Sequence, residues 1–242
     1  MPRAAKLFSP ETIEPYRISR TGLELFHNCP RCFYFEKRLG KKRPAGFPFN
    51  LNSAVDKLLK REFDHYRAQE LPHPLMVSAG IDAVPYIHAE LENWRNNFKG
   101  VQYLHEPSNF LICGAVDDLW QSAAGDLIVV DYKATAKAAA ITELNAEWHQ
   151  AYKRQLEIYQ WLLRRNGHRV SKRAYWVYAN GNSDAESFNE TLRFRMTVIP
   201  YQAEDSWVEP HILGAKACLT LDAPPSAATD CEWCQFAEAR SI

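Results

Sequence analysis

The chain has 242 residues, and its 29 Lys and Arg are balanced by 29 Asp and Glu, so the formal net charge is zero. A zero net charge does not indicate a generalised polyanion-binding surface, and any contact with nucleic acid must use local basic patches. Residues 1–10 contain no long apolar segment, and nowhere do about 18 apolar residues run together. We therefore expect no membrane partner and a cytoplasmic location.

The first part of the chain is expected to be helical. Residues 18–40 predict a helix, a turn and a second helix, because a Cys-Pro-Arg-Cys turn separates two apolar runs. Apolar residues recur at helical spacing over residues 50–66, with Asn52 or Ser53 as the N-cap. A helical pattern resumes over residues 81–98, where an internal proline marks the first turn.

The middle of the chain predicts a β-hairpin over residues 111–133. Two apolar runs, 111–120 and 127–130, are joined by a segment of small and turn-forming residues, 122–126. A short strand at residues 101–105 is expected to lead into this hairpin. The hairpin would form the centre of a sheet.

A long helix and two more strands are expected after the hairpin. Residues 142–166 carry the longest helical pattern, residues 170–179 and 192–198 are strand-like, and residues 204–221 are helical again. This order favours a mixed α/β fold with helices on both faces of a small sheet. We expect a single domain over residues 1–242.

The predicted hairpin carries charged residues that a buried sheet does not normally tolerate. Asp117 lies on its first strand, and Asp131 and Lys133 end the second. Burying them costs several kcal/mol unless they are paired or bind a metal. Mg²⁺ prefers oxygen ligands, which these carboxylates and the backbone carbonyl of Tyr132 could supply. Asp118 should face away from Asp117 and is left out of the site.

Lys133 should lie beside this metal, because side chains at positions i and i+2 project from the same face of a strand. Its ammonium group could orient or help deprotonate an attacking water, or offset charge on a phosphorus centre. The alternative from the residues alone is a surface hairpin in which Asp131 and Lys133 only form an ion pair.

Three motifs occur in a fixed order along the chain: Gly-Ala-Val-Asp at 114–117, Asp-Tyr-Lys at 131–133, and Gln-Leu-Glu-Ile-Tyr at 155–159. They resemble the G-x-(I/V)-D, D-x-K and Q-x-x-x-Y motifs of the RecB-like branch of the PD-(D/E)XK nuclease superfamily. The resemblance implies a restriction-endonuclease-like core at about residues 50–200. The small mixed sheet would then be the scaffold of a nuclease site.

The resemblance also implies roles for individual residues. In the family, the first Asp and the acid of D-x-K bind Mg²⁺ or Mn²⁺, and the Lys assists hydrolysis, which here means Asp117, Asp131 and Lys133. Gln155 and Tyr159 would lie near the site and the nucleic-acid backbone. From the residues alone, Gln155 and Tyr159 are neighbours one turn apart on one helix face, and Tyr159 would be interpreted as an aromatic residue of the core.

A third protein ligand is expected on the helix before the hairpin, where the family often has a His. The matching position here is Asp56, and a carboxylate suits a hard cation as well as an imidazole does. His65 on the same helix is the rival, although it lies more than two turns away and reads as a partly exposed histidine. We expect Asp56 to complete the metal shell.

Four cysteines form two C-x-x-C pairs near the ends of the chain: Cys29, Cys32, Cys231 and Cys234. In a reducing compartment such pairs bind Zn²⁺ or an iron-sulfur cluster through thiolates. The first pair alone could also be a redox dithiol. Because the pairs lie in segments 18–40 and 223–242, a shared metal would clasp the two segments together.

The AddB and CRISPR-associated exonuclease groups of RecB-like nucleases resemble this arrangement, since they have an early Cys-Pro-Arg and further cysteines after the nuclease core. Those cysteines hold a 4Fe-4S cluster, with one early and three late ligands. This chain has two and two, a pattern that suits zinc equally well. The resemblance to these groups predicts a 4Fe-4S cluster, and the two-and-two pattern leaves Zn²⁺ as the alternative.

The sequence favours a metal-dependent deoxyribonuclease that hydrolyses phosphodiester bonds of single-stranded DNA or DNA ends, in repair, recombination or defence. DNA is the expected partner, and a helicase or another DNA-processing protein is a further candidate, because the chain has no helicase motif. The main alternative is a non-catalytic nucleic-acid-binding module with a structural metal site made by the four cysteines. A thiol redox protein is the third interpretation.

Overall fold

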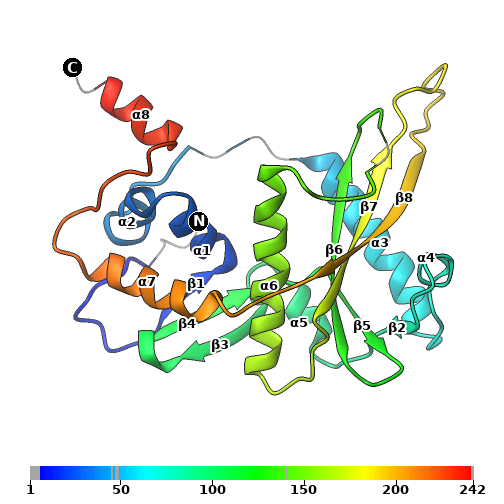
Figure 1. Ribbon diagram of the computed structural model, residues 1–242, viewed down its shortest axis with the longest axis horizontal. Helices are drawn as coiled ribbons and strands as arrows, with labels where there is room; N and C mark the ends of the chain where they lie inside the picture. The colour runs from blue at the N-terminus through cyan, green and yellow to red at the C-terminus, as the bar shows by residue number, and fades with distance from the viewer. Residues whose placement is uncertain (1–5, 45, 47–48, 140, 241–242) are drawn as a thin grey trace. The chain divides into compact units, whose positions relative to one another are not determined.

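The computed structural model describes residues 6–44, 46, 49–139 and 141–240 (Figure 1). The chain forms two compact units. Unit 1 comprises residues 1–47, 102–113 and 206–242, and unit 2 comprises residues 48–101 and 114–205. Within the described ranges, no helix is long and apolar enough to cross a membrane.

Unit 1 contains a three-stranded sheet and the helices α2 and α8, on or just before which the four paired cysteines lie. The strand order is β1-β4-β3, with β1 parallel to β4. The expected helix-turn-helix of residues 18–40 is present, and the Ser19 hydroxyl caps its first helix by accepting from the Gly22 N–H at 3.2 Å. The elements are β1 (Tyr16–Ser19), α1 (Arg20–Asn28), α2 (Pro30–Leu39), β3 (Val101–His105), η1 (Glu106–Ser108), β4 (Phe110–Gly114), α7 (Val208–Thr220) and α8 (Glu232–Ala239).

Unit 2 is built on a five-stranded sheet in the order β2-β5-β6-β7-β8. Only the β6–β7 pair is parallel; its two strands are joined through helix α6, as parallel neighbours require a crossover connection (Figure 1). The strands are β2 (Ala83–Pro85), β5 (Asp118–Ser122), β6 (Leu127–Thr135), β7 (Arg173–Gly181) and β8 (Phe194–Gln202). The helices are α3 (Asn50–Arg67), α4 (Pro74–Ser78), α5 (Leu91–Arg95), η2 (Glu147–His149) and α6 (Gln150–Arg165).

The predicted hairpin is present as β5 and β6, but its first strand is shorter than expected. The turn closes through the Ser122 N–H, which donates to the Asp126 carbonyl at 3.0 Å, and Gly125 adopts a φ of 84° that favours glycine. The apolar run 111–120 is two strands, β4 and β5, which belong to different sheets. Asp117 lies in the bend between them, and not on a strand.

Two helix predictions were wrong in their extent. Residues 81–98 contain strand β2 and the short helix α5, because β2 pairs with β5 as the edge strand of the sheet. Helix α6 begins at Gln150 and not at residue 142, since the backbone N–H of Ala146 donates to His149 Nδ1 at 3.0 Å and sets a separate turn there. In the first case a tertiary contact overrides local helical spacing, and in the second a local side-chain hydrogen bond does so.

The N-cap prediction for the helix at residues 50–66 was also wrong. The helix itself is confirmed as α3, but neither Asn52 nor Ser53 caps it. The Ser53 hydroxyl donates to the Phe49 carbonyl at 3.2 Å, and the Asn52 amide donates to the Ala134 carbonyl at 3.0 Å. Asn52 therefore ties the start of α3 to the end of β6.

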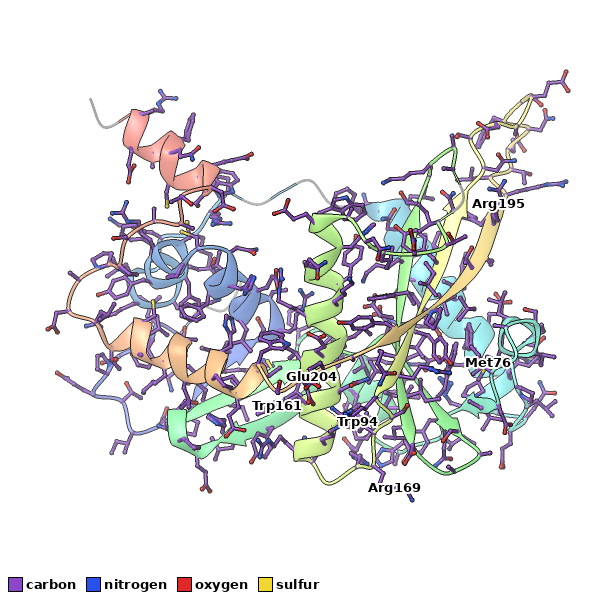
Figure 2. The ribbon with its side chains drawn as sticks, in the orientation of Figure 1. Met76, Trp94, Trp161, Arg169, Arg195 and Glu204 are labelled. Carbon is purple, nitrogen blue, oxygen red and sulfur yellow. The ribbon has the colours of Figure 1, made fainter. Side chains whose placement is uncertain are left out.

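Helices cover both faces of the five-stranded sheet, as expected. On one face, Phe63 of α3 stacks on Trp120 and packs against Tyr132, and Met76 joins the same core from α4 (Figure 2). Side chains alternate along β6, so Asp131 faces the opposite side, towards α6. The sheet thus has an apolar face under α3 and a face with charged groups under α6.

Candidate active site

Asp131 is the most deeply buried acid of the predicted site. Its side chain is 0% exposed, and neither carboxylate oxygen has a hydrogen-bond partner among the described residues, although the Lys133 ammonium forms an ion pair with Oδ2. Burial is the main cause that raises the pKa of Asp131 to about 7; the charge of Lys133 opposes the rise and that of Asp117 reinforces it. A buried carboxylate with unfilled acceptor positions fits a divalent cation.

Asp117 lies next to Asp131 and has its own set of donors. Its Oδ2 accepts from the backbone N–H of Tyr132 at 3.0 Å, and its Oδ1 accepts from Lys60 Nζ at 3.3 Å. Burial alone would raise its pKa, but the charges of Lys60 and Lys133 and the Tyr132 N–H together lower the pKa of Asp117. The bend between β4 and β5 therefore places an ionised carboxylate beside Asp131.

Asp56 reaches this cluster through a lysine that the sequence analysis did not single out. Lys60 Nζ donates to Asp56 Oδ2 at 2.9 Å as well as to Asp117. Burial and the charge of Asp117 raise the pKa of Asp56. The signal that could have revealed Lys60 is its position four residues after Asp56, on the same face of α3. Asp56 as a metal ligand stays a prediction.

Lys133 is held on the α6 side of the sheet by three groups. It forms the ion pair with Asp131, donates to Gln155 Oε1 at 3.3 Å, and lies 4.6 Å from the ring centroid of Tyr152. Burial would lower its pKa, but the charges of Asp131 and Asp117 raise the pKa of Lys133. The amine is therefore a cation that can stabilise negative charge developing nearby.

The three motifs meet in space as well as in sequence. Gln155 Nε2 donates to the Tyr159 hydroxyl at 3.0 Å, which leaves Gln155 Oε1 turned towards Lys133. A Cβ atom at Gly114 would lie 2.7 Å from the ring of Tyr159, closer than real contacts allow. Glycine at position 114 thus lets Tyr159 pack under the bend that carries Asp117.

Asp118 is buried in a separate network, which the sequence analysis did not predict. Its Oδ1 accepts from both Arg67 and Arg95, the second at 2.7 Å, and from the Leu119 N–H at 2.8 Å. Its Oδ2 accepts from the Tyr132 hydroxyl at 2.7 Å. Both arginines come from helices that are distant in sequence from Asp118, so no local pattern predicts the network. All of these partners are structural, and none leaves Asp118 free to bind a metal.

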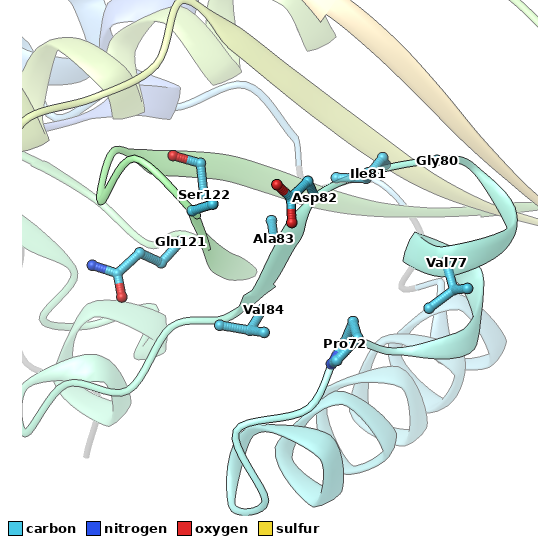
Figure 3. A pocket seen from close by; sticks show the side chains of 10 residues that line it. Pro72, Val77, Gly80, Ile81, Asp82, Ala83, Val84, Gln121 and Ser122 are labelled. Carbon is cyan, nitrogen blue, oxygen red and sulfur yellow. The ribbon is translucent and has the colours of Figure 1, made fainter.

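Two of the cavities lined by described residues belong to unit 2. The smaller, of about 100 Å³, lies beside Lys133 and is lined by Asn52, Val55, Asp56, Leu59, Tyr132, Lys133, Ala134 and Tyr152. The larger, of about 520 Å³, lies between α4 and the β2 edge, where Val77 and Pro72 face Ile81 and Asp82 (Figure 3). The larger cavity contains none of the residues of the predicted site, whereas the smaller one opens beside it.

The four cysteines of unit 1 converge as predicted. Their Sγ atoms lie within 4.8 Å of one another, all four are buried, and the closest pairs, from Cys32 to Cys234 and Cys231, are 3.5 and 3.6 Å apart. Arg43 Nη2 lies 3.3 Å from Cys231 Sγ. Burial opposes ionisation, but backbone hydrogen bonds help lower the pKa of Cys29 to about 7. The donor set is that of a thiolate metal site.

A protein-family model for the PD-(D/E)XK nuclease superfamily matches residues 17–239. The match covers both the motifs and the cysteines, and the chain belongs to the PD-(D/E)XK nuclease superfamily. Membership confirms the expected fold class and makes the chain a nuclease of a superfamily that uses divalent metals. The acids, Lys133 and the α6 residues thus have the setting of a nuclease site.

Other comparisons add less. The solved structure entitled "Crystal structure of SSO0001" is similar over 94% of this chain and 87% of that chain, with 15% sequence identity and a TM-score of 0.42. None of the curated proteins compared with the chain matches it significantly.

Proposed function

We propose that the protein is a Mg²⁺- or Mn²⁺-dependent deoxyribonuclease that hydrolyses phosphodiester bonds of single-stranded DNA or DNA ends. One observation carries the proposal. Asp131 is fully buried, has no donor among the described residues apart from the Lys133 ammonium that pairs with Oδ2, and lies beside a second carboxylate, that of Asp117. A divalent ion would relieve the repulsion between the two acids.

Each residue of the site would have its own role in hydrolysis. Asp117, Asp131 and the backbone carbonyl of Tyr132 would hold the ion, with Asp56 as the further ligand. When bound, the ion polarises the phosphate and lowers the pKa of the attacking water. Lys133 would orient that water and offset charge on the phosphorus centre. Gln155, supported by Tyr159, would fix Lys133, and both would lie near the DNA backbone.

The test is cleavage of labelled single-stranded DNA in Mn²⁺ by the variants Asp117→Ala, Asp131→Ala and Lys133→Ala. We expect all three to lose cleavage while their circular dichroism stays that of the wild type. Lys57→Ala, which removes an exposed lysine from α3, is the control and should keep full activity. Wild-type cleavage by all three site variants would contradict the proposal, and binding without cutting by the wild type would support the non-catalytic module instead.

We further propose that the cysteines hold one structural Zn²⁺. Four sulfurs at about 2.3 Å from a single tetrahedral zinc lie about 3.8 Å apart. Three of the six Sγ–Sγ separations are 3.5, 3.6 and 3.8 Å, and all six are within 4.8 Å, which is near that spacing. A 4Fe-4S cluster, which the family resemblance favours, binds its four thiolates to separate irons and needs a wider cage. Arg43 beside Cys231 would offset the negative charge of the tetrathiolate.

Metal analysis of anaerobically purified protein distinguishes the two. We expect one zinc per chain, no iron and no band in the visible spectrum. Iron with inorganic sulfide, and a visible band that bleaches on reduction, would contradict zinc and support the cluster. A disulfide with no metal would support the redox interpretation.

A further inference from the structure

Strand β6 ends and helix α6 begins at the same end of unit 2 (Figure 1). A row of aromatic rings and lysines leads away from Lys133 there. Lys133 Nζ lies 4.6 Å from the ring centroid of Tyr152, and the Tyr152 ring meets Trp148 edge to face at 5.6 Å. Lys137 Nζ lies 4.9 Å from the Trp148 ring centroid. From the site to the surface, the row therefore consists of a lysine, two aromatic rings and a second lysine.

The outer ring of this row is open to solvent. Trp148 is 49% exposed, although a large aromatic side chain normally gains by burial. It is nevertheless held in place, because its ring lies 3.7 Å from that of His149 and contacts Tyr152. An exposed, immobilised indole that already interacts with a cation is a ready stacking surface.

The backbone next to the row is fixed by buried groups. Asn180, 5% exposed, accepts from the Lys137 N–H at 2.8 Å and donates to the Lys137 carbonyl at 2.9 Å. His149 is buried, and its Nδ1 accepts from the Ala146 N–H. In a neutral ring the proton is then on Nε2, which has no hydrogen-bond partner among the described residues. A buried N–H donor is thus left unmatched at the base of the row.

The charge around His149 points to an anionic ligand. Burial first, and then the nearby charges of Lys137 and Lys153, lower the pKa of His149. Burial and the two ammonium groups therefore favour the neutral form of the ring. Two cations and an unmatched N–H donor next to two aromatic rings form a donor set suited to a chain of phosphates and bases.

We propose that Trp148 and Tyr152 form a stacking site for the unpaired bases of a single-stranded nucleic acid, whose phosphates contact Lys137 and Lys153 and lead to Lys133. This inference rests on the proposed nuclease function, because it names the form of substrate that the same site takes. Bases in a duplex are stacked on each other and cannot lie on Trp148 without being unpaired. The row should therefore select single strands, whether at an end or in a loop.

The test measures binding in the full-length Asp131→Asn background, which prevents cutting. The probes are a fluorescent oligothymidylate of about 12 nucleotides, an abasic strand of the same length, and a blunt duplex. We expect Trp148→Ala to weaken binding of oligothymidylate about tenfold, which corresponds to about 1.4 kcal/mol. Trp148→Phe should retain most of the affinity, and binding of the abasic strand and the duplex should not change.

Phe98→Ala is the matched control, since Phe98 is an exposed aromatic residue of unit 2, 84% exposed, outside the row. It should bind every probe as the parent does. Equal affinity of Trp148→Ala and the parent for oligothymidylate would overturn the inference, and so would an equal loss on the abasic strand.

The result is separable from the proposed function. If the wild type cuts DNA in Mn²⁺ and Trp148→Ala cuts with an unchanged KM, the stacking site is overturned and the nuclease stands. If Trp148→Ala binds oligothymidylate selectively less well but the wild type cuts nothing, the stacking site stands and the nuclease proposal fails.

Discussion

Two buried acid groups lie on opposite faces of the five-stranded sheet and have opposite surroundings. On the α3 face, Asp118 receives hydrogen bonds from two arginines, a backbone N–H and a tyrosine hydroxyl. On the α6 face, Asp131 is equally buried but has no donor among the described residues other than its ion pair with Lys133. Asp117 and Asp118 are neighbours in the chain, yet each belongs to a different group.

The difference separates a structural acid from a functional one. Burying a charge is costly unless hydrogen bonds and opposite charges replace the lost water. For Asp118 the replacement is complete, so the network can hold α3, α5 and β5 together. For Asp131 it is incomplete, which leaves acceptor positions for an ion and a substrate. A buried acid whose hydrogen bonds and opposite charges do not fully replace the lost water therefore indicates the active site in this protein.

The largest effect on stability is expected at the satisfied acid. Asp118→Ala leaves Arg67 and Arg95 buried, and among the described residues the remaining acids that pair with them are the more exposed Asp64 and Glu92. We expect the free energy of unfolding in urea to fall by about 3–5 kcal/mol. Asp82→Ala, at an exposed acid, is the control and should change it by less than about 0.5 kcal/mol. If Asp118→Ala lowers the free energy of unfolding by less than about 1 kcal/mol, on the order of a single hydrogen bond, Asp118 is not the structural acid that this comparison requires.

The largest effect on activity is expected at the unsatisfied acid. Asp131→Asn removes a metal ligand, and metal-ion catalysis contributes several kcal/mol, so cleavage should fall roughly a thousandfold. Stability of the metal-free protein should stay equal or rise, because an amide is cheaper to bury than a carboxylate. Urea unfolding with chelator and single-turnover cleavage give the two numbers. A large loss of stability would place Asp131 with Asp118 as a structural acid.

A smaller effect is expected where the motifs contact each other. Gly114→Ala would put a Cβ 2.7 Å from the Tyr159 ring. Overpacking of this kind costs about 1–3 kcal/mol, and the shift should also displace Asp117 and reduce cleavage. Gly46→Ala is the control, because an added Cβ there has no atom within 4 Å. Thermal unfolding and cleavage of Gly114→Ala like those of the wild type would show that the contact is unimportant.

The smallest effect is expected at Gln155. Gln155→Ala removes hydrogen bonds to Lys133 and Tyr159, each contributing about 1 kcal/mol. We expect the free energy of unfolding to fall by no more than the sum of these two contributions. Cleavage should fall roughly tenfold, since Lys133 keeps its ion pair with Asp131. Gln155→Glu, which keeps an acceptor for Lys133, should lose less. A complete loss of cleavage in Gln155→Ala would assign Gln155 a direct role in the reaction.

The sequence predicted the elements and residues that have local signals. The Asp-Tyr-Lys strand, the helix with Gln155 and Tyr159 and the two cysteine pairs could be placed because each has its own spacing. The network of Asp118 could not be predicted, because its arginines come from elements distant in sequence. For Lys60, local spacing indicates the ion pair with Asp56, but not the one with Asp117, which lies 57 residues away in the chain. The same limit explains residues 81–98, where pairing with β5 decides the structure and the helical pattern is misleading.

Mn²⁺ binding measured by electron paramagnetic resonance tests the central claim most directly, because it reports the ion without requiring cleavage. The wild type should bind Mn²⁺ at a site that is lost in both Asp117→Asn and Asp131→Asn and kept in Asp82→Asn. If Asp117→Asn and Asp131→Asn both bind Mn²⁺ as the wild type does, the two acids do not hold the metal.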